Sequence, residues 1–177
     1  ETCDDAMLGA SVLLIFEKPA KILSEVEWNT IFFFTGLFII IGGLEASGGI
    51  KLMAEWILNV TNGSENATAM IILWASGIIS GVIDNIPYTA TMAPMIAEIQ
   101  RVMGAEYAYP LWWCLSLGAC LGGNMTIIGA AANVIVSENA AKEGHPMTFM
   151  RFLKYGIPVV LISLVISTIY IYVRFLH

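Results

Sequence analysis

The chain has 177 residues, of which 58% are hydrophobic and 12% are charged, and its mean hydropathy is +0.77. Soluble domains carry about 25% charged residues, so about half of the usual solvated surface is missing; a lipid bilayer explains the deficit, because lipid-facing positions rarely carry charge. The net charge of −6 comes without a basic stripe, which excludes a nucleic-acid-binding protein.

The first two apolar stretches differ in length. Residues 6–16 are too few to cross a bilayer, and the chain starts without an initiator Met, so we expect it to be a section of a longer protein. The uncharged run from Trp28 to Leu44 is long enough and predicts a spanning helix at about 28–45. A short surface helix is expected around 50–60.

The next apolar stretch, from Asn66 to Ala97, is interrupted by a single charge at Asp84. The arm after Asp84 has 13 uncharged residues and contains Pro87 and Pro94. Thirteen helical residues reach about 20 Å, which is short of a hydrocarbon core of about 30 Å. We therefore predict a re-entrant helical hairpin over about 66–100, with two ordinary crossings as the alternative.

The stretch from Tyr107 to Ser137 is uncharged over 31 residues, and a single helix of that length would be about 46 Å long. Its middle reads Gly-Gly-Asn-Met-Thr-Ile-Ile-Gly, which is poor material for a continuous helix. The pattern predicts a helix over about 108–142 that is broken at mid-membrane, with one half before Gly122 and the other from about Asn133.

The last uncharged run predicts a second spanning helix at about 156–174. Together the elements predict an all-α membrane protein. Cys114 and Cys120 lie about 240° apart around one predicted helix, so we expect small buried side chains and no disulfide between them.

A single carboxylate and one polar cluster interrupt the apolar runs, and they contain the candidate functional residues. An unpaired carboxylate at membrane depth is costly, so Asp84 predicts ion or proton binding; a loop-end residue at the headgroups is the alternative. The polar cluster, Gly123, Asn124, Thr126 and Asn133, accompanies a helix break, where free carbonyls and half-helix ends suit ions. No Ser-His-Asp or His-Glu-x-x-His arrangement is present in the sequence, so we expect no enzyme.

Three segments resemble a known family. Ser80–Pro94 resembles the hairpin-tip signature of the ion-transporter superfamily, in its branch of arsenite-efflux pumps, sodium–proton antiporters and the melanosomal P protein, which share a citrate-transporter-like domain. Leu121–Asn133 is similar to the broken-helix signature of that branch, and Phe38–Glu45 resembles the scaffold helix before the hairpin. The resemblance extends from about residue 26 to about residue 175.

The resemblance implies a transporter of two inverted repeats, each with a hairpin and a broken helix, in which residues 1–177 form the C-terminal repeat. It also implies an ion bound between the hairpin tip and the break. The implied binding residues are Asp84, Asn85, Thr89, Gly123, Asn124, Thr126 and Asn133, with Asp84, Asn85, Asn124 and Thr126 as ligands of a sodium ion.

Two departures from the family pattern bear on the substrate. Related dicarboxylate symporters carry Ser-Asn-Thr at the tip, and this chain has Asp84-Asn85-Ile86 instead, which argues against a dicarboxylate. Ala130–Ala132 stand where many relatives have prolines, and this variant resembles the P protein group most.

The sequence thus predicts a secondary active transporter that moves a small ion by alternating access, with sodium–proton exchange as the leading hypothesis. Efflux of a small anion such as arsenite or a carboxylate is the alternative within this class; a non-transporting membrane scaffold subunit is the alternative outside it. The expected partners are the lipid bilayer, the missing N-terminal repeat and the small ion, with a homodimer as a further assembly. A bound sodium ion is the only cofactor expected. The membrane would be the plasma membrane of a bacterium or an organelle membrane of a eukaryote.

Overall fold

The computed structural model describes residues 2–16, 26 and 28–176. Every regular element in this described part is a helix, which confirms the predicted all-α fold. The chain divides into two units, residues 1–37 and 38–177, and each is considered by itself. The first unit contains α1 (Thr2–Phe16), whose 15 residues are fewer than a crossing requires, and the first part of α3.

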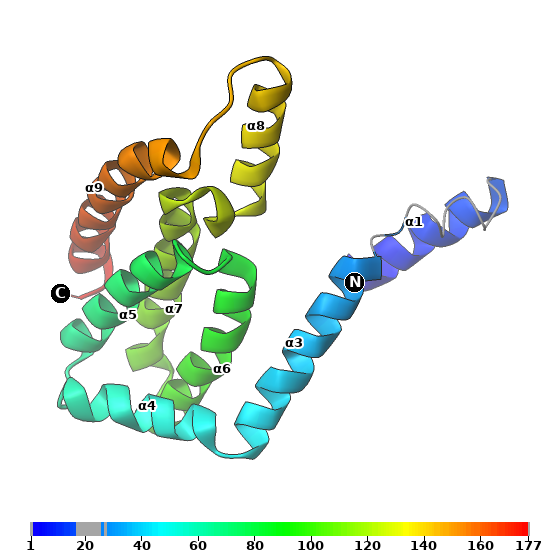
Figure 1. Ribbon diagram of the computed structural model, residues 1–177. Coiled ribbons are helices and arrows are strands. Elements are labelled where there is room, and N and C mark those ends of the chain that lie inside the picture. The colour runs from blue at the N-terminus through cyan, green and yellow to red at the C-terminus, as the bar shows by residue number, and fades with distance from the viewer. Residues whose placement is uncertain (1, 17–25, 27, 177) are drawn as a thin grey trace. The chain divides into compact units, whose positions relative to one another are not determined.

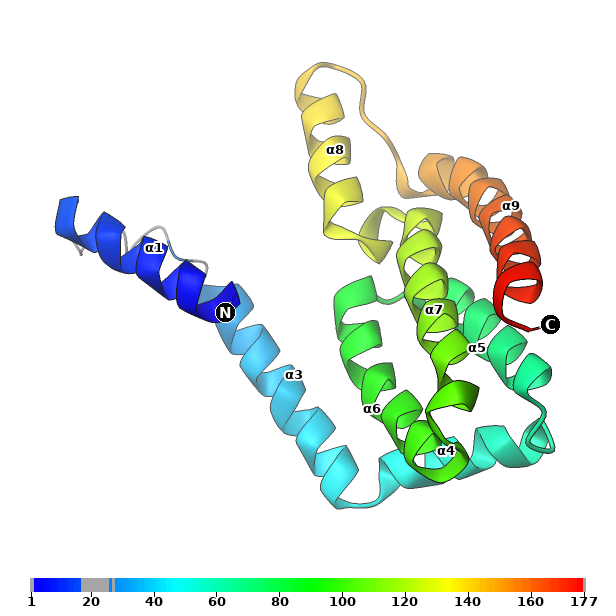
Figure 2. The same ribbon diagram turned by 180° about the vertical axis from the view of Figure 1, so that it is seen from behind.

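The helix α3 (Trp28–Ala46) forms where the first spanning helix is predicted. It is followed by α4 (Gly49–Val60), in which Ile50, Ala54 and Ile57 recur at helical spacing and are buried. The chain turns between the two helices at Gly48, which has a φ of 79°. Glycine is favoured in this left-handed region because it has no Cβ atom to clash with the backbone. Figures 1 and 2 show α4 lying across the ends of the helices that follow.

The predicted hairpin consists of α5 (Glu65–Ser80) and α6 (Asn85–Met103). Both helices begin at side-chain caps: Ser64 accepts from the Ala67 N–H, and Asp84 accepts from the Ile86 N–H. The second arm continues past its uncharged part, through an ion pair between Glu98 and Arg101. It has 19 residues and not the 13 of the uncharged run, so it is about 28 Å long, close to the thickness of the hydrocarbon core. The expectation of a short second arm is therefore wrong, and length alone does not separate a re-entrant hairpin from two crossings.

The predicted broken helix consists of α7 (Ala105–Gly122), two short 3-10 turns η1 (Gly123–Met125) and η2 (Ile127–Gly129), and α8 (Ala131–Lys142). The first half ends at Gly122, as the glycine pair predicts. The second half begins two residues before Asn133. None of the side chains of α8 is buried within the chain.

The last helix, α9 (Phe149–Phe175), begins seven residues before the predicted span because Thr148 caps it by accepting from the Arg151 N–H. Its 27 residues make it about 40 Å long, which exceeds the hydrocarbon core. Among the described helices, α3 and α9 are long and apolar enough to cross a membrane.

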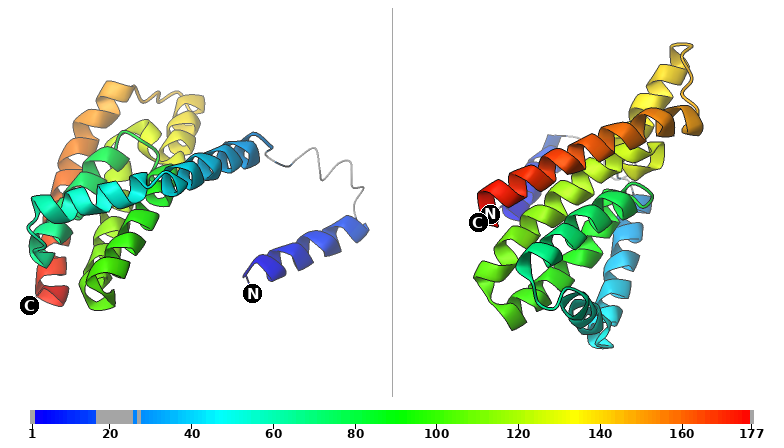
Figure 3. Two further views of the ribbon diagram at one scale, coloured as in Figure 1. Left: turned by 90° about the horizontal axis from the view of Figure 1, so that it is seen from below. Right: turned by 90° about the vertical axis from the view of Figure 1, so that its left-hand side faces the viewer.

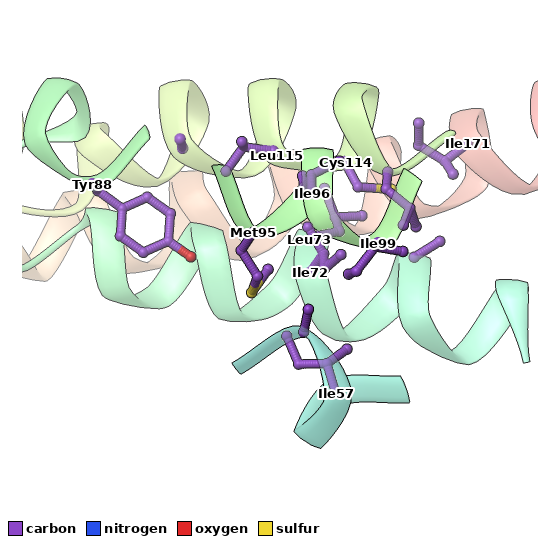
Figure 4. Close-up of a cluster of buried hydrophobic side chains, with 14 of the residues drawn as sticks. Ile57, Ile72, Leu73, Tyr88, Met95, Ile96, Ile99, Cys114, Leu115 and Ile171 are labelled. Carbon is purple, nitrogen blue, oxygen red and sulfur yellow. The ribbon is translucent and has the colours of Figure 1, made fainter. Parts of the chain in front are cut away.

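The core of the second unit is formed around α7. Both hairpin arms and α9 pack against it, and Figure 3 shows α5, α7 and α9 side by side. The largest buried side chains are mainly aliphatic, with Tyr88, Met95 and Cys114 among the buried residues (Figure 4). Cys120 is exposed, so the expectation that both cysteines are buried is wrong for Cys120. Both cysteines are free thiols, as the spacing predicts. This packing fixes where the hairpin tip lies relative to the break.

Candidate functional site

The hairpin tip and the helix break touch each other. The Thr126 hydroxyl donates a hydrogen bond of 2.7 Å to the carbonyl oxygen of Gly81, and Thr126 is 4% exposed. A Cβ atom added at Gly81 would lie 3.0 Å from the Gly122 carbonyl oxygen and would collide with the Met125 side chain. The two motifs that the sequence singles out are therefore in direct contact, and glycine at position 81 permits it.

Small residues bring the first half of the broken helix close to the first hairpin arm. A Cβ atom at Gly122 would collide with the backbone of Gly77, and one at Gly118 would lie 2.7 Å from the Ser76 Cβ. The spacing of Gly118 and Gly122 is that of small residues which let membrane helices approach closely. The Ser80 hydroxyl donates to the Ala119 carbonyl oxygen at 2.6 Å and adds a polar link to this contact. The break is thus held beside the tip by backbone contact.

Asn133 organises the break itself. Its side-chain N–H₂ group donates to the carbonyl oxygens of Gly123, at 2.9 Å, and Thr126, at 3.0 Å. These two carbonyls lie in the segment that the sequence predicts to bind an ion. The Thr126 carbonyl oxygen also accepts from the Gly129 N–H at 3.3 Å, so both of its lone pairs are used. The Asn133 side-chain oxygen is not used by the two bonds of its N–H₂ group. Through these two bonds, Asn133 holds the oxygen-rich segment in its observed conformation.

The carboxylate at the tip is used as a helix cap. Asp84 is half-buried, and its Oδ1 accepts a hydrogen bond of 2.9 Å from the Ile86 N–H. Asn85 and Thr89 are half-buried in the first turns of α6. In the described part of the chain, no hydrogen bond joins the side chains of these three residues to the break. The chain brings the tip and the break together through Gly81, and Asp84 follows three residues later.

Asn124 lies on a different side of the break. It is exposed and lines a cavity of 390 Å³. The other lining residues are Met147, just before α9, and four residues of the N-terminal part of α9: Phe152, Tyr155, Gly156 and Val159. A Cβ atom at Gly156 would lie 2.8 Å from the Asn124 carbonyl oxygen. The break is therefore packed between the hairpin tip on one side and α9 on the other.

The hairpin tip and the helix break contain few ionisable side chains. Among the described residues, no cluster of three or more His, Cys, Asp or Glu side chains could hold a metal ion. An ion bound at the tip and the break would meet one carboxylate, from Asp84, and neutral oxygens. This donor set fits a monovalent cation better than a divalent one, because protein sites for divalent cations use several carboxylates.

Sequence reasoning missed several residues that build this site. Gly77 and Gly156 carry close backbone contacts, and Ser80 carries a hydrogen bond to α7, but no motif in the sequence predicts these roles. A signal was present, since small residues inside otherwise apolar helices indicate close helix packing. That pattern does not indicate which residue each of them contacts.

Comparisons with known proteins identify the family. Residues 5–118 match a family described as citrate transporter. An uncharacterized transporter of Mycobacterium tuberculosis is 43% identical over 173 residues, which cover 96% of this chain and 40% of that protein. The P protein of Sus scrofa is 40% identical over 177 residues, which cover 95% of this chain and 21% of that protein. No solved structure matches the chain.

The chain therefore spans less than half the length of these relatives. The family match covers more than half of the chain itself and agrees with the resemblance of the hairpin-tip motif. The chain belongs to the citrate transporter family of membrane transport proteins, within the ion-transporter superfamily.

Proposed function

We propose that the full-length protein is a secondary active transporter that exchanges sodium ions for protons by alternating access. This chain supplies one of its two repeats, and the ion binds between the hairpin tip and the break. The relatives named as transporters support membrane transport as the general activity. The exchange reaction and the site are our proposal.

The contact between Thr126 and Gly81 is the observation that carries this proposal. It brings the turn that ends in Asp84 next to a segment of neutral oxygens. The Thr126 hydroxyl oxygen and the Gly81 carbonyl oxygen are 2.7 Å apart. A single carboxylate in an apolar environment is costly when bare, so it binds either a cation or a proton. A site that holds one or the other, but not both, couples the movement of sodium to that of protons.

The cap of α6 supports a cation over an anion. The first turn of a helix carries a partial positive charge that attracts anions. At the start of α6 the Asp84 carboxylate already occupies this position, through its bond to the Ile86 N–H. An anionic substrate would meet this negative charge, whereas a sodium ion would be attracted by it.

A second candidate is the transport of a carboxylate, because the matching family is described as citrate transporter. The start of α8 favours it, because its N-cap, Ala130, provides no side-chain hydrogen bond. The positive end of this half-helix remains open to an anion. In this candidate, sodium would bind at the tip and the carboxylate at the start of α8.

Flux measurements on the full-length protein in liposomes separate the candidates. With an acidic interior, we expect uptake of radioactive sodium that is accompanied by loss of the proton gradient, and no uptake of labelled citrate. Citrate uptake that requires sodium, without loss of the proton gradient, would favour the second candidate. Failure to move either solute would contradict both, provided that the protein is folded in the liposomes.

A further inference from the structure

A buried hydroxyl pair joins the two arms of the hairpin close to the tip. The oxygen atoms of Tyr88, on α6, and Ser76, on α5, are 3.1 Å apart. Tyr88 is 6% exposed and Ser76 is fully buried. In the described part of the chain, this is the one side-chain hydrogen bond between α5 and α6. Figure 4 shows the ring of Tyr88 directed toward α5.

The arms depend on this bond because they have few other direct contacts. Each arm packs mainly against α7, so the packing of each arm is fixed separately. Near the tip, the distance between the arms is then set by the turn and by the bond between Tyr88 and Ser76.

Tyr88 is also connected to the proposed site through the backbone. Its N–H donates to the Asp84 carbonyl oxygen at 3.2 Å, which closes the first turn of α6. On the other arm, Ser76 lies one turn before Ser80, whose hydroxyl donates to the Ala119 carbonyl oxygen in α7. A series of contacts thus runs from Asp84 through Tyr88 and α5 to the helix that contains the break.

We propose that Tyr88 is a positioning residue for transport: its hydroxyl, bonded to Ser76, sets the position of Asp84 relative to the break. This inference rests on the proposed function, because it concerns the carboxylate at the same site. Tyr88 itself need not touch the ion. Loss of the hydroxyl would leave the ring packed and free the first turn of α6 to move.

The chain offers a matched control for this proposal. Tyr107 bonds to Thr68 of α5 at 2.8 Å, at the far end of the hairpin from the tip. Tyr107→Phe and Tyr88→Phe therefore make the same chemical change and break the same kind of bond. They differ in distance from Asp84.

The test uses the full-length protein with Tyr88→Phe, Ser76→Ala, the double variant and Tyr107→Phe. We expect each of the first two changes to raise the sodium concentration for half-maximal flux by about three- to tenfold, the range for one neutral hydrogen bond. The maximal rate should change by less than about twofold, and the double variant should be no worse than the single ones. Tyr107→Phe should leave the sodium dependence unchanged.

A second readout does not depend on transport. Ile83→Cys is introduced at the exposed tip, in a background whose native cysteines are replaced by alanine, and its rate of reaction with a maleimide is measured. We expect Tyr88→Phe and Ser76→Ala to change this rate by at least about threefold, and Tyr107→Phe to leave it unchanged.

Two outcomes would overturn the positioning role: additive effects of Tyr88→Phe and Ser76→Ala, or an unchanged labelling rate at the tip in both variants. If the unmodified protein shows no sodium flux, the proposed function fails instead. The labelling rates then still decide whether the bond between Tyr88 and Ser76 holds the tip.

Discussion

Thr126 and Gly81 are 45 positions apart in the sequence, and a hydrogen bond of 2.7 Å joins the hydroxyl of the first to the carbonyl oxygen of the second. Through this bond the break of one helix is fixed against the tip of a hairpin. Neither segment is a regular helix at this point, so each has backbone groups that need partners. The Thr126 hydroxyl supplies one for the Gly81 carbonyl oxygen, and the N–H₂ group of Asn133 supplies one each for the Gly123 and Thr126 carbonyl oxygens.

The first prediction concerns Asp84 in the full-length protein. Asp84→Asn keeps the shape of the side chain and an oxygen that can cap α6, but it removes the charge. We expect proton-coupled sodium flux in liposomes to be lost while expression and folding remain nearly normal, because the site can no longer alternate between a proton and a cation.

Glu98→Gln is the control for this change, since it removes a carboxylate from the same helix at its far end. Glu98 is engaged by Arg101, at 2.6 and 2.8 Å, and should not affect coupling. Unchanged sodium and pH dependence in Asp84→Asn would show that this carboxylate is structural only.

The second prediction concerns Thr126. Thr126→Ala removes both the bond to the Gly81 carbonyl oxygen and a neutral oxygen beside the proposed ion. We expect sodium affinity to fall by about 1–3 kcal/mol, the value of a hydrogen-bonding group that interacts with a charge. The measurement is the sodium dependence of flux or a direct binding isotherm.

Thr126→Ser keeps the hydroxyl and should restore most of the affinity. Thr91→Ala is a useful comparison, because the Thr91 hydroxyl bonds to the Pro87 carbonyl oxygen within its own helix. Equal losses in Thr126→Ala and Thr91→Ala would mean that Thr126 has no special role.

The third prediction concerns the close contact of α5 and α7. A Cβ atom at Gly122 collides with the Gly77 backbone, which cannot move aside like a side chain. We expect Gly122→Ala to lower the stability of the folded protein by about 1–3 kcal/mol, as over-packing does elsewhere. The measurement is thermal or denaturant unfolding of the purified full-length protein.

The matched control is Gly43→Ala in α3, where no atom lies within 4 Å of the added Cβ. Alanine is the better helix former, so this variant should be unchanged or more stable by up to about 1 kcal/mol. Similar destabilisation in both variants would indicate a general effect of replacing glycine.

The fourth prediction concerns topology. Thr68 and Tyr107 are bonded, so the two ends of the hairpin lie together. Cysteines at Ser64 and Ala105 should react with an impermeant maleimide from the same side of the membrane, and one at Glu143 from the opposite side.

A cysteine at Val82 then distinguishes the re-entrant arrangement from two full crossings. If the tip remains within the protein, it should react far more slowly than the cysteine at Glu143 when reagent is added from that side. Equal rates would mean that both arms cross the membrane and that the tip is an ordinary loop.

Local patterns in the sequence account for most of the helices and for several of their ends. Long runs without charged residues predict helices in a bilayer. Ser64, Asp84 and Thr148 cap helices through contacts with residues two or three positions away. The glycine pair at 122–123 ends α7 for an equally local reason. These features depend on neighbours along the chain, and the sequence displays such neighbours directly.

Which residues meet depends instead on how the helices pack. Asn124 is predicted as an ion ligand, and the structure shows that it lines a cavity against α9. Tyr88 joins the two arms, although no local pattern in the sequence assigns it this role. Asn133 is predicted as a binding residue, and it also donates to two carbonyl oxygens of the break. These contacts join residues up to 45 positions apart. Their partners depend on how α5, α6 and α9 pack around α7, which no local pattern specifies.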